Sequence, residues 1–75
     1  MVKFEVGKSY KVGDKYTAHG VITVVSRTET EVICEVKAYG ETHQQSFEIQ
    51  ALSRVFGVEI IRVMQNSVGA DAEVK

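Results

Sequence analysis

The apolar residues of this chain are almost all β-branched, since thirteen valines and five isoleucines accompany a single leucine, Leu52. Branching at Cβ restricts a side chain in a helix and suits it to the pleated surface of a sheet. Proline is absent, so glycine is the residue that marks turns, at Gly7, Gly13, Gly20, Gly40 and Gly57. The sequence therefore predicts a chain built from strands.

A chain of 75 residues has room for one small domain. Its 44% hydrophobic and 25% charged residues are typical of globular proteins. No stretch approaches the roughly 18–20 consecutive apolar residues that a membrane-spanning helix needs. From Asn66 onward the residues are mostly small or charged and include no aromatic side chain. We therefore expect one β domain over residues 1–65 and a flexible tail over residues 66–75.

The expected compartment follows from the cysteine count and the first residues. A lone cysteine, Cys34, excludes an internal disulfide. Glu5 interrupts the apolar run that a secretory signal would need near this point. We therefore expect a reduced, cytoplasmic protein that does not cross a membrane.

The clearest local unit is a hairpin in which two valine-rich runs, 21–26 and 31–36, flank a loop at 27–30. A four-residue loop would set Val25 opposite Val32 and Val24 opposite Ile33. In that register both faces of the hairpin are apolar, one of them through Ile22, Val24 and Ile33. Either a bent hairpin feeds both faces into a barrel core, or this second face is a partner surface.

The other segments complete a β fold. Alternating apolar residues predict strands over 2–12 and 42–49, and a last strand is expected over 58–64. Apolar spacing between residues 51 and 56 favours a helical turn that ends at Gly57. We therefore expect an all-β, five-stranded SH3-like barrel or roll with a short helical turn before the last strand. An α+β fold with one helix near 47–56 is the alternative.

Two segments carry a resemblance, Phe4-Glu-Val-Gly-Lys-Ser-Tyr and Val24-Val-Ser-Arg-Thr-Glu-Thr-Glu-Val. They resemble short β-barrel proteins of phages and mobile elements of Gram-positive bacteria, which share a Val-Gly-Lys-x-Tyr opening and an Arg-Thr-x-x-x-Val hairpin tip. The resemblance implies a biological setting and brings no catalytic residues with it.

Candidate reactive groups are few. Cys34, His19 and His43 form the one set that suggests a thiol nucleophile or a metal site. Cys34 lies between Val32 and Val36 at strand spacing, where a thiol packs as a small apolar side chain. The three residues also lack the paired spacing of a structural zinc site. We therefore expect no enzyme activity, no metal and no cofactor.

Two binding functions fit such a chain. The first is a non-enzymatic protein-binding module, an accessory or inhibitory protein of a phage or mobile element, or a self-associating one, whose partner surface comprises Ile22, Val24, Ile33, Glu35, Lys37 and Tyr39. The alternative is a nucleic-acid-binding β-barrel that uses Lys8, Tyr10, Lys11, Lys15 and Tyr16. A net charge of −1 disfavours nucleic acid, since phosphate binding needs a concentrated positive field.

Overall fold

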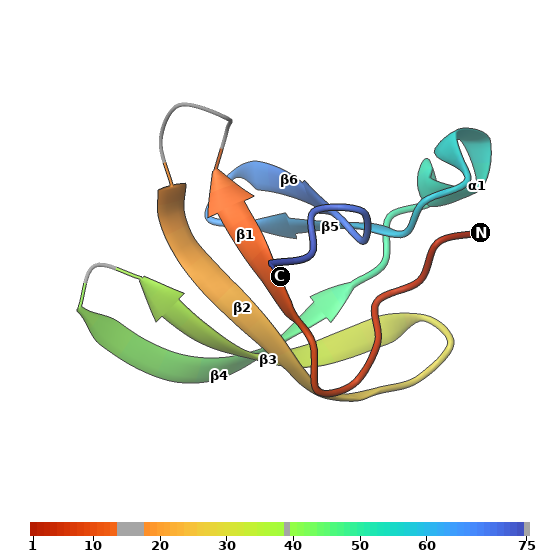
Figure 1. Ribbon diagram of the computed structural model, residues 1–75. Coiled ribbons are helices and arrows are strands. Elements are labelled where there is room, and N and C mark those ends of the chain that lie inside the picture. Colours follow the sequence, from red (N-terminus) through yellow and green to blue (C-terminus); the bar gives the residue numbers. More distant parts are fainter. Residues whose placement is uncertain (14–17, 39, 75) are drawn as a thin grey trace.

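The computed structural model describes residues 1–13, 18–38 and 40–74, and in them six strands form two antiparallel sheets (Figure 1). The larger sheet is a meander in strand order, made of β1 (Ser9–Gly13), β2 (Ala18–Arg27), β3 (Glu31–Ala38) and β4 (Glu41–Glu48). The smaller is a hairpin of β5 (Ile60–Val63) and β6 (Asn66–Gly69). The mostly β prediction is confirmed, but the sheets do not close into a five-stranded barrel.

The additional strand comes from a tight turn that the sequence did not reveal. Val63 pairs with Asn66, so β5 and β6 are joined by only Met64 and Gln65. Both turn residues have positive φ, at 48° and 65°. A two-residue hairpin turn of this kind is usually marked by Asn or Gly, which tolerate positive φ. Methionine and glutamine give no such signal. The sequence therefore predicts a single last strand where the structure has a hairpin.

Residues 70–74 continue beyond β6 and lie along β1. The Lys11 amide donates a hydrogen bond to the Ala72 carbonyl at 3.1 Å, and the Val74 amide donates to the Ser9 carbonyl at 2.8 Å. The expected flexible tail over 66–75 is therefore corrected for its described part, 66–74, which forms a strand and then covers the edge of β1. Val68 is only 2% exposed, and its burial in the core holds this part of the chain in place.

The β2–β3 hairpin forms as expected, but its register differs from the expected one, by one residue up to Val24 and by two residues at Ser26. Val24 pairs with Cys34 and Ser26 with Ile33, because a bulge at Val25 shifts the pairing. The loop is also shorter than predicted, since the Thr28 hydroxyl accepts hydrogen bonds from two amides after it and keeps Arg27 in β2. A one-residue shift reverses which face each side chain takes.

This register resolves the question of two apolar faces. Ile22 and Val24 lie on the same side as Cys34 and are fully buried. Only Val25, on the bulge, is an exposed large apolar residue of this hairpin, at 40%. The first explanation, in which the fold itself covers the apolar side chains, therefore holds for Ile22 and Val24.

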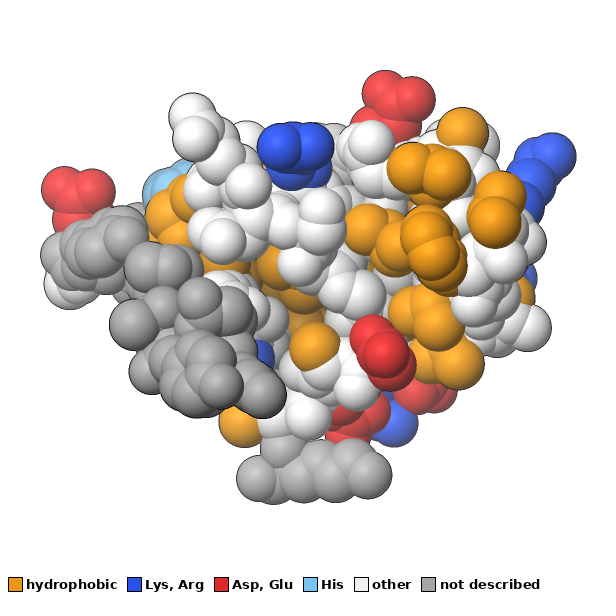
Figure 2. Space-filling model, turned by 90° about the horizontal axis from the view of Figure 1, so that it is seen from above, with side chains coloured by type: hydrophobic (Ala, Val, Ile, Leu, Met, Phe, Trp, Pro, Cys, Tyr) orange, Lys and Arg blue, Asp and Glu red, His pale blue; other side chains and the backbone are white. Residues whose placement is uncertain are grey.

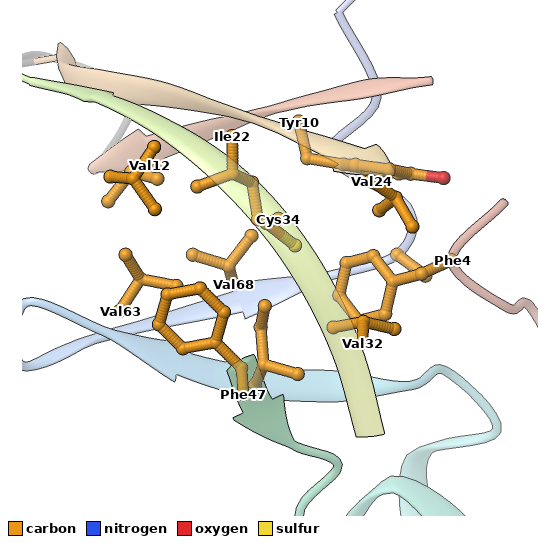
Figure 3. Packing of buried hydrophobic residues seen from close by; sticks show 13 residues of the cluster. Phe4, Tyr10, Val12, Ile22, Val24, Val32, Cys34, Phe47, Val63 and Val68 are labelled. Carbon is orange, nitrogen blue, oxygen red and sulfur yellow. The ribbon is translucent and has the colours of Figure 1, made fainter. Parts of the chain in front are cut away.

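The core lies between the two sheets (Figure 3). Phe4 and Tyr10 meet edge to face, with ring centroids 4.9 Å apart. Side chains of the meander face those of the hairpin across this layer, and the cluster comprises Phe4, Tyr10, Val12, Ile22, Val24, Val32, Cys34, Val36, Phe47, Ile61, Val63, Val68 and Ala70.

A single helical turn, α1 (Ser53–Phe56), joins the sheets and confirms the expected turn at 51–56. The alternative of a helix near 47–56 is wrong, because Phe47 and Glu48 belong to β4 and Phe47 packs in the core. In the described part of the chain, no helix has the length and apolar character needed to span a membrane.

Candidate functional site

The helix α1 and Leu52, the residue at its N-cap, present three large apolar side chains to solvent. Leu52, Val55 and Phe56 are 60%, 76% and 64% exposed, and we call them the α1 patch. Figure 2 shows hydrophobic side chains gathered over the end of the molecule that carries α1. A single helical turn can bury only one side, and here that side is taken by Ser53.

Short hydrogen bonds hold α1 in place. The Ser53 hydroxyl, 2% exposed, accepts a hydrogen bond from the Ile60 amide at 2.8 Å. The Gly57 amide donates to the Ser53 carbonyl at 2.9 Å, and Gly57 ends the helix in the left-handed region with φ of 70°. Glycine takes this conformation without steric strain. The helix that carries the α1 patch is therefore tied to β5 by the hydrogen bond between Ser53 and Ile60.

A groove of about 620 Å³ lies between α1 and the outer face of the β5–β6 hairpin. Its apolar walls are Leu52, Phe56, Val58 and Ile60, and its polar rim includes Arg62 and Asp71. Gly69 has no side chain and leaves the groove open, whereas a Cβ at that position would press on the Asp71 carboxylate and touch a Val58 methyl group.

The N-terminal segment runs beside α1 and extends the apolar region. The Val2 amide donates to the Gly57 carbonyl, and the Val2 carbonyl accepts from the Glu59 amide, each at 2.9 Å. Val2 thereby forms a parallel bridge with Val58. Met1 and Val2 remain 61% and 47% exposed, so apolar surface continues from the helix onto this segment.

A buried ion pair holds the N-terminal segment in that position. Arg27 donates two hydrogen bonds to the Glu59 carboxylate, at 2.7 and 2.8 Å, and a third to the Phe4 carbonyl at 2.7 Å. The Phe4 amide donates to Glu59 Oε1 at 2.7 Å. Burial alone would raise the pKa of Glu59, but the hydrogen bonds from Arg27 and Phe4 outweigh it and lower the pKa below its usual 4.5.

The residues predicted as a partner surface are not brought together. Ile22 and Val24 are buried in the core, which corrects their assignment to an exposed face, because the bulge at Val25 turns both inward. Ile33, Glu35 and Lys37 lie on the opposite, outer face of β3, where Lys37 is 3.8 Å from Glu35. Tyr39 lies outside the described residues.

The residues of the nucleic-acid alternative are also dispersed. Tyr10 is fully buried, and its hydroxyl accepts a hydrogen bond from the Glu5 amide, so its ring offers no stacking surface. Lys8 pairs with Glu5 at 2.8 Å and with Glu73 at 3.3 Å. Lys11 is half-buried on β1. Lys15 and Tyr16 lie outside the described residues.

Cys34 packs in the core as expected, and burial raises the pKa of its thiol to about 11. His43 lies on β4 opposite Val36 and shares a 3.1 Å hydrogen bond with Gln45. The side chain of His19 lies outside the described part of the chain. The thiol therefore has no described base beside it that could activate it at neutral pH.

The α1 patch and its groove were missed as a site by the sequence reasoning. The spacing of Leu52, Val55 and Phe56 predicts a helical turn and nothing more. A usable signal exists, because a turn this short with three large apolar residues has more apolar surface than one contact can cover. No family model matches the chain, and neither a curated protein nor a solved structure does.

Proposed function

We propose that this chain is a non-enzymatic protein-binding module that docks a partner protein on the α1 patch and the adjoining groove. The observation that carries the proposal is the exposure of Leu52, Val55 and Phe56 on a rigidly held turn. In a small domain almost all apolar area is needed for the core, so a cluster left in solvent favours an interaction site.

The composition of this surface supports a protein partner. Apolar and aromatic side chains form its centre, while Arg54 on α1 and Arg62 and Asp71 at the groove are exposed charges. An apolar centre with a charged rim is the usual make-up of a protein interface. The resemblance to short phage and mobile-element proteins further suggests an accessory or inhibitory role, acting by occlusion of the partner.

The proposal keeps the likeness to SH3-like barrels only for the order of the elements along the chain. A meander followed by one helical turn and a further strand agrees with that order, whereas two unclosed sheets are not a barrel. The nucleic-acid alternative loses a stacking residue with the burial of Tyr10. A flat salt dependence of oligonucleotide binding would remove it entirely.

The test compares capture by matched surface variants. Immobilised wild-type protein, Val55→Ser, Phe56→Ser and the control Val25→Ser are each incubated with lysate of the organism that encodes the chain. Val25 is an exposed valine of β2, outside the α1 patch and its groove. We expect wild type and the Val25→Ser control to capture a partner. We expect Phe56→Ser to lose about 2 kcal/mol of binding free energy, as is typical of a residue at the centre of an interface.

Thermal unfolding separates binding from folding in this experiment. All three variants should keep the melting temperature of the wild type, because each changed side chain is exposed. Equal capture by Phe56→Ser and wild type would refute docking at the α1 patch.

A further inference from the structure

The two edges of the larger sheet are treated differently by the fold. At β1, residues 72–74 pair with Ser9–Lys11, and the outward Lys11 amide and Ser9 carbonyl are both bonded. At β4, no described residue makes a backbone hydrogen bond to the outer edge before Gln50, whose amide donates to the Ile60 carbonyl. An edge strand with unpaired amides and carbonyls is a template for another strand.

The residues that face outward on β4 follow from its register. Glu31 pairs with Glu48, and the Ile49 amide donates to the Thr30 carbonyl. Since antiparallel pairs alternate between bonded and non-bonded, the odd-numbered residues of β4 bond to β3. Thr42, Gln44 and Ser46 therefore direct their amides and carbonyls away from the sheet.

This edge lacks the features with which proteins usually prevent strand pairing. Five consecutive residues, 42–46, carry neither a lysine nor a carboxylate. The β3–β4 register runs without a bulge over all eight pairs, unlike the registers of β1–β2 and β2–β3. Charges, prolines and bulges are the common protections of an edge, and residues 42–46 have none of them.

We propose that β4 pairs antiparallel with β4 of a second copy of this chain, about a two-fold axis at Gln44. This register sets Gln44 opposite its symmetry mate and Thr42 opposite Ser46 of the other copy. It forms three residue pairs, each exchanging two hydrogen bonds. The two meanders then become one continuous sheet, and the α1 patch takes no part in the contact.

Charge is compatible with this arrangement and opposes registers centred on the two ends of β4. In the proposed register Glu41 faces Phe47 of the other copy and Glu48 faces Gly40, so no carboxylate opposes another. A two-fold axis at Glu41 or at Glu48 would set that carboxylate against its own symmetry mate, and like charges directly opposite one another destabilise a sheet. Pairing about Gln44 therefore joins two copies of β4 without opposing any two carboxylates.

The test is the oligomeric state of the full chain by sedimentation velocity over a concentration series. Wild type is expected to form a dimer, whose melting temperature rises with concentration. Gln44→Pro should be monomeric with an unchanged circular dichroism spectrum, because its amide donates no bond to β3 and proline is tolerated on such an edge. A wild-type chain that stays monomeric throughout the series overturns the proposal.

A charge exchange tests the two-fold register without proline. Gln44→Lys and Gln44→Glu each set like charges opposite one another across the axis, so each alone should lose the dimer. An equimolar mixture should recover it as a heterodimer, because the introduced charges then attract. Dimers of undiminished stability in both separate variants would overturn the proposed register.

The variant Phe56→Ser serves as the control and distinguishes this interface from the proposed partner site. It should remain dimeric, since the α1 patch lies outside the β4 edge. A dimer that is lost in Phe56→Ser and kept in Gln44→Pro would show that copies associate through the α1 patch, and would overturn pairing through β4.

Discussion

Glu59 is the buried charged residue on which the position of the N-terminal segment depends. Its carboxylate accepts from Arg27 and from the Phe4 amide, and its own amide donates to the Val2 carbonyl. A buried carboxylate is tolerated only when such partners replace its hydration. The ion pair therefore stabilises the segment that extends the apolar region beside α1.

We predict that Glu59→Gln lowers the free energy of unfolding by about 3 kcal/mol at neutral pH, because Arg27 is left without its counter-charge. Denaturant titration measures this loss. The exposed Glu29→Gln, whose carboxylate lies 3.8 Å from Lys3, is the control and should leave stability unchanged. Equal behaviour of the two variants would contradict a structural role for the ion pair.

The same residue predicts a pH dependence. Because the folded-state pKa of Glu59 lies below the usual 4.5, its contribution is fully present above pH 4.5 and is lost as pH falls through the lowered value. Wild type should therefore lose more unfolding free energy than Glu59→Gln between neutral and acidic pH. Parallel pH profiles for the two proteins, measured by denaturant titration, would show that Glu59 does not titrate as the structure requires.

Cys34 gives a second prediction for a single residue. Burial raises the pKa of its thiol to about 11, so the thiolate is scarce at neutral pH and the sulfur is shielded from solvent. A thiol reagent should leave the folded protein unlabelled and label it fully in denaturant. Rapid labelling of the native state would mean that the core opens far more readily than its packing indicates.

Among the elements, the C-terminal segment has the clearest structural role. Its contacts with Ser9 and Lys11 cover one edge of the meander, and its pairing was invisible in a sequence of small and charged residues. Composition alone suggested a tail, because the bonds that hold this segment are made by backbone groups, which every residue has.

We predict that removal of residues 71–75 exposes the outer edge of β1. The amide of Lys11 loses its acceptor at Ala72 and should exchange hydrogen with solvent much faster, as hydrogen exchange by NMR would reveal. The amide of Val12, whose side chain lies in the core and whose strand partner is Gly20, serves as the internal control. Unchanged exchange at Lys11 would indicate that the segment is not docked in solution.

At the scale of the whole molecule, two small sheets share one core and should unfold together. Ile61 of β5 is fully buried between them, whereas Val55 of α1 is largely exposed. We predict that Ile61→Ala lowers the free energy of unfolding by about 3 kcal/mol, while Val55→Ala changes it by less than about 0.5 kcal/mol. Both values come from denaturant titration, and similar values for the two would contradict the observed packing.

The strand-rich secondary structure, the end of α1 and the buried thiol could be predicted, because each depends on residues that are neighbours in sequence. The β-branched residues determined the mostly β fold, Gly57 marked the end of α1, and the apolar neighbours of Cys34 placed its thiol in the core. Each of these results follows from backbone preference and side-chain alternation over a few residues.

Only the tertiary structure decided the hairpin register, the sixth strand and the exposed surface. The bulge at Val25 turned Ile22 and Val24 inward, and positive φ at Met64 and Gln65 made a turn without glycine. Such features are stabilised by burial of residues distant in sequence, so local pattern does not reveal them. For the same reason the α1 patch and the open edge of β4 could be recognised only after the rest of the apolar surface had been packed away.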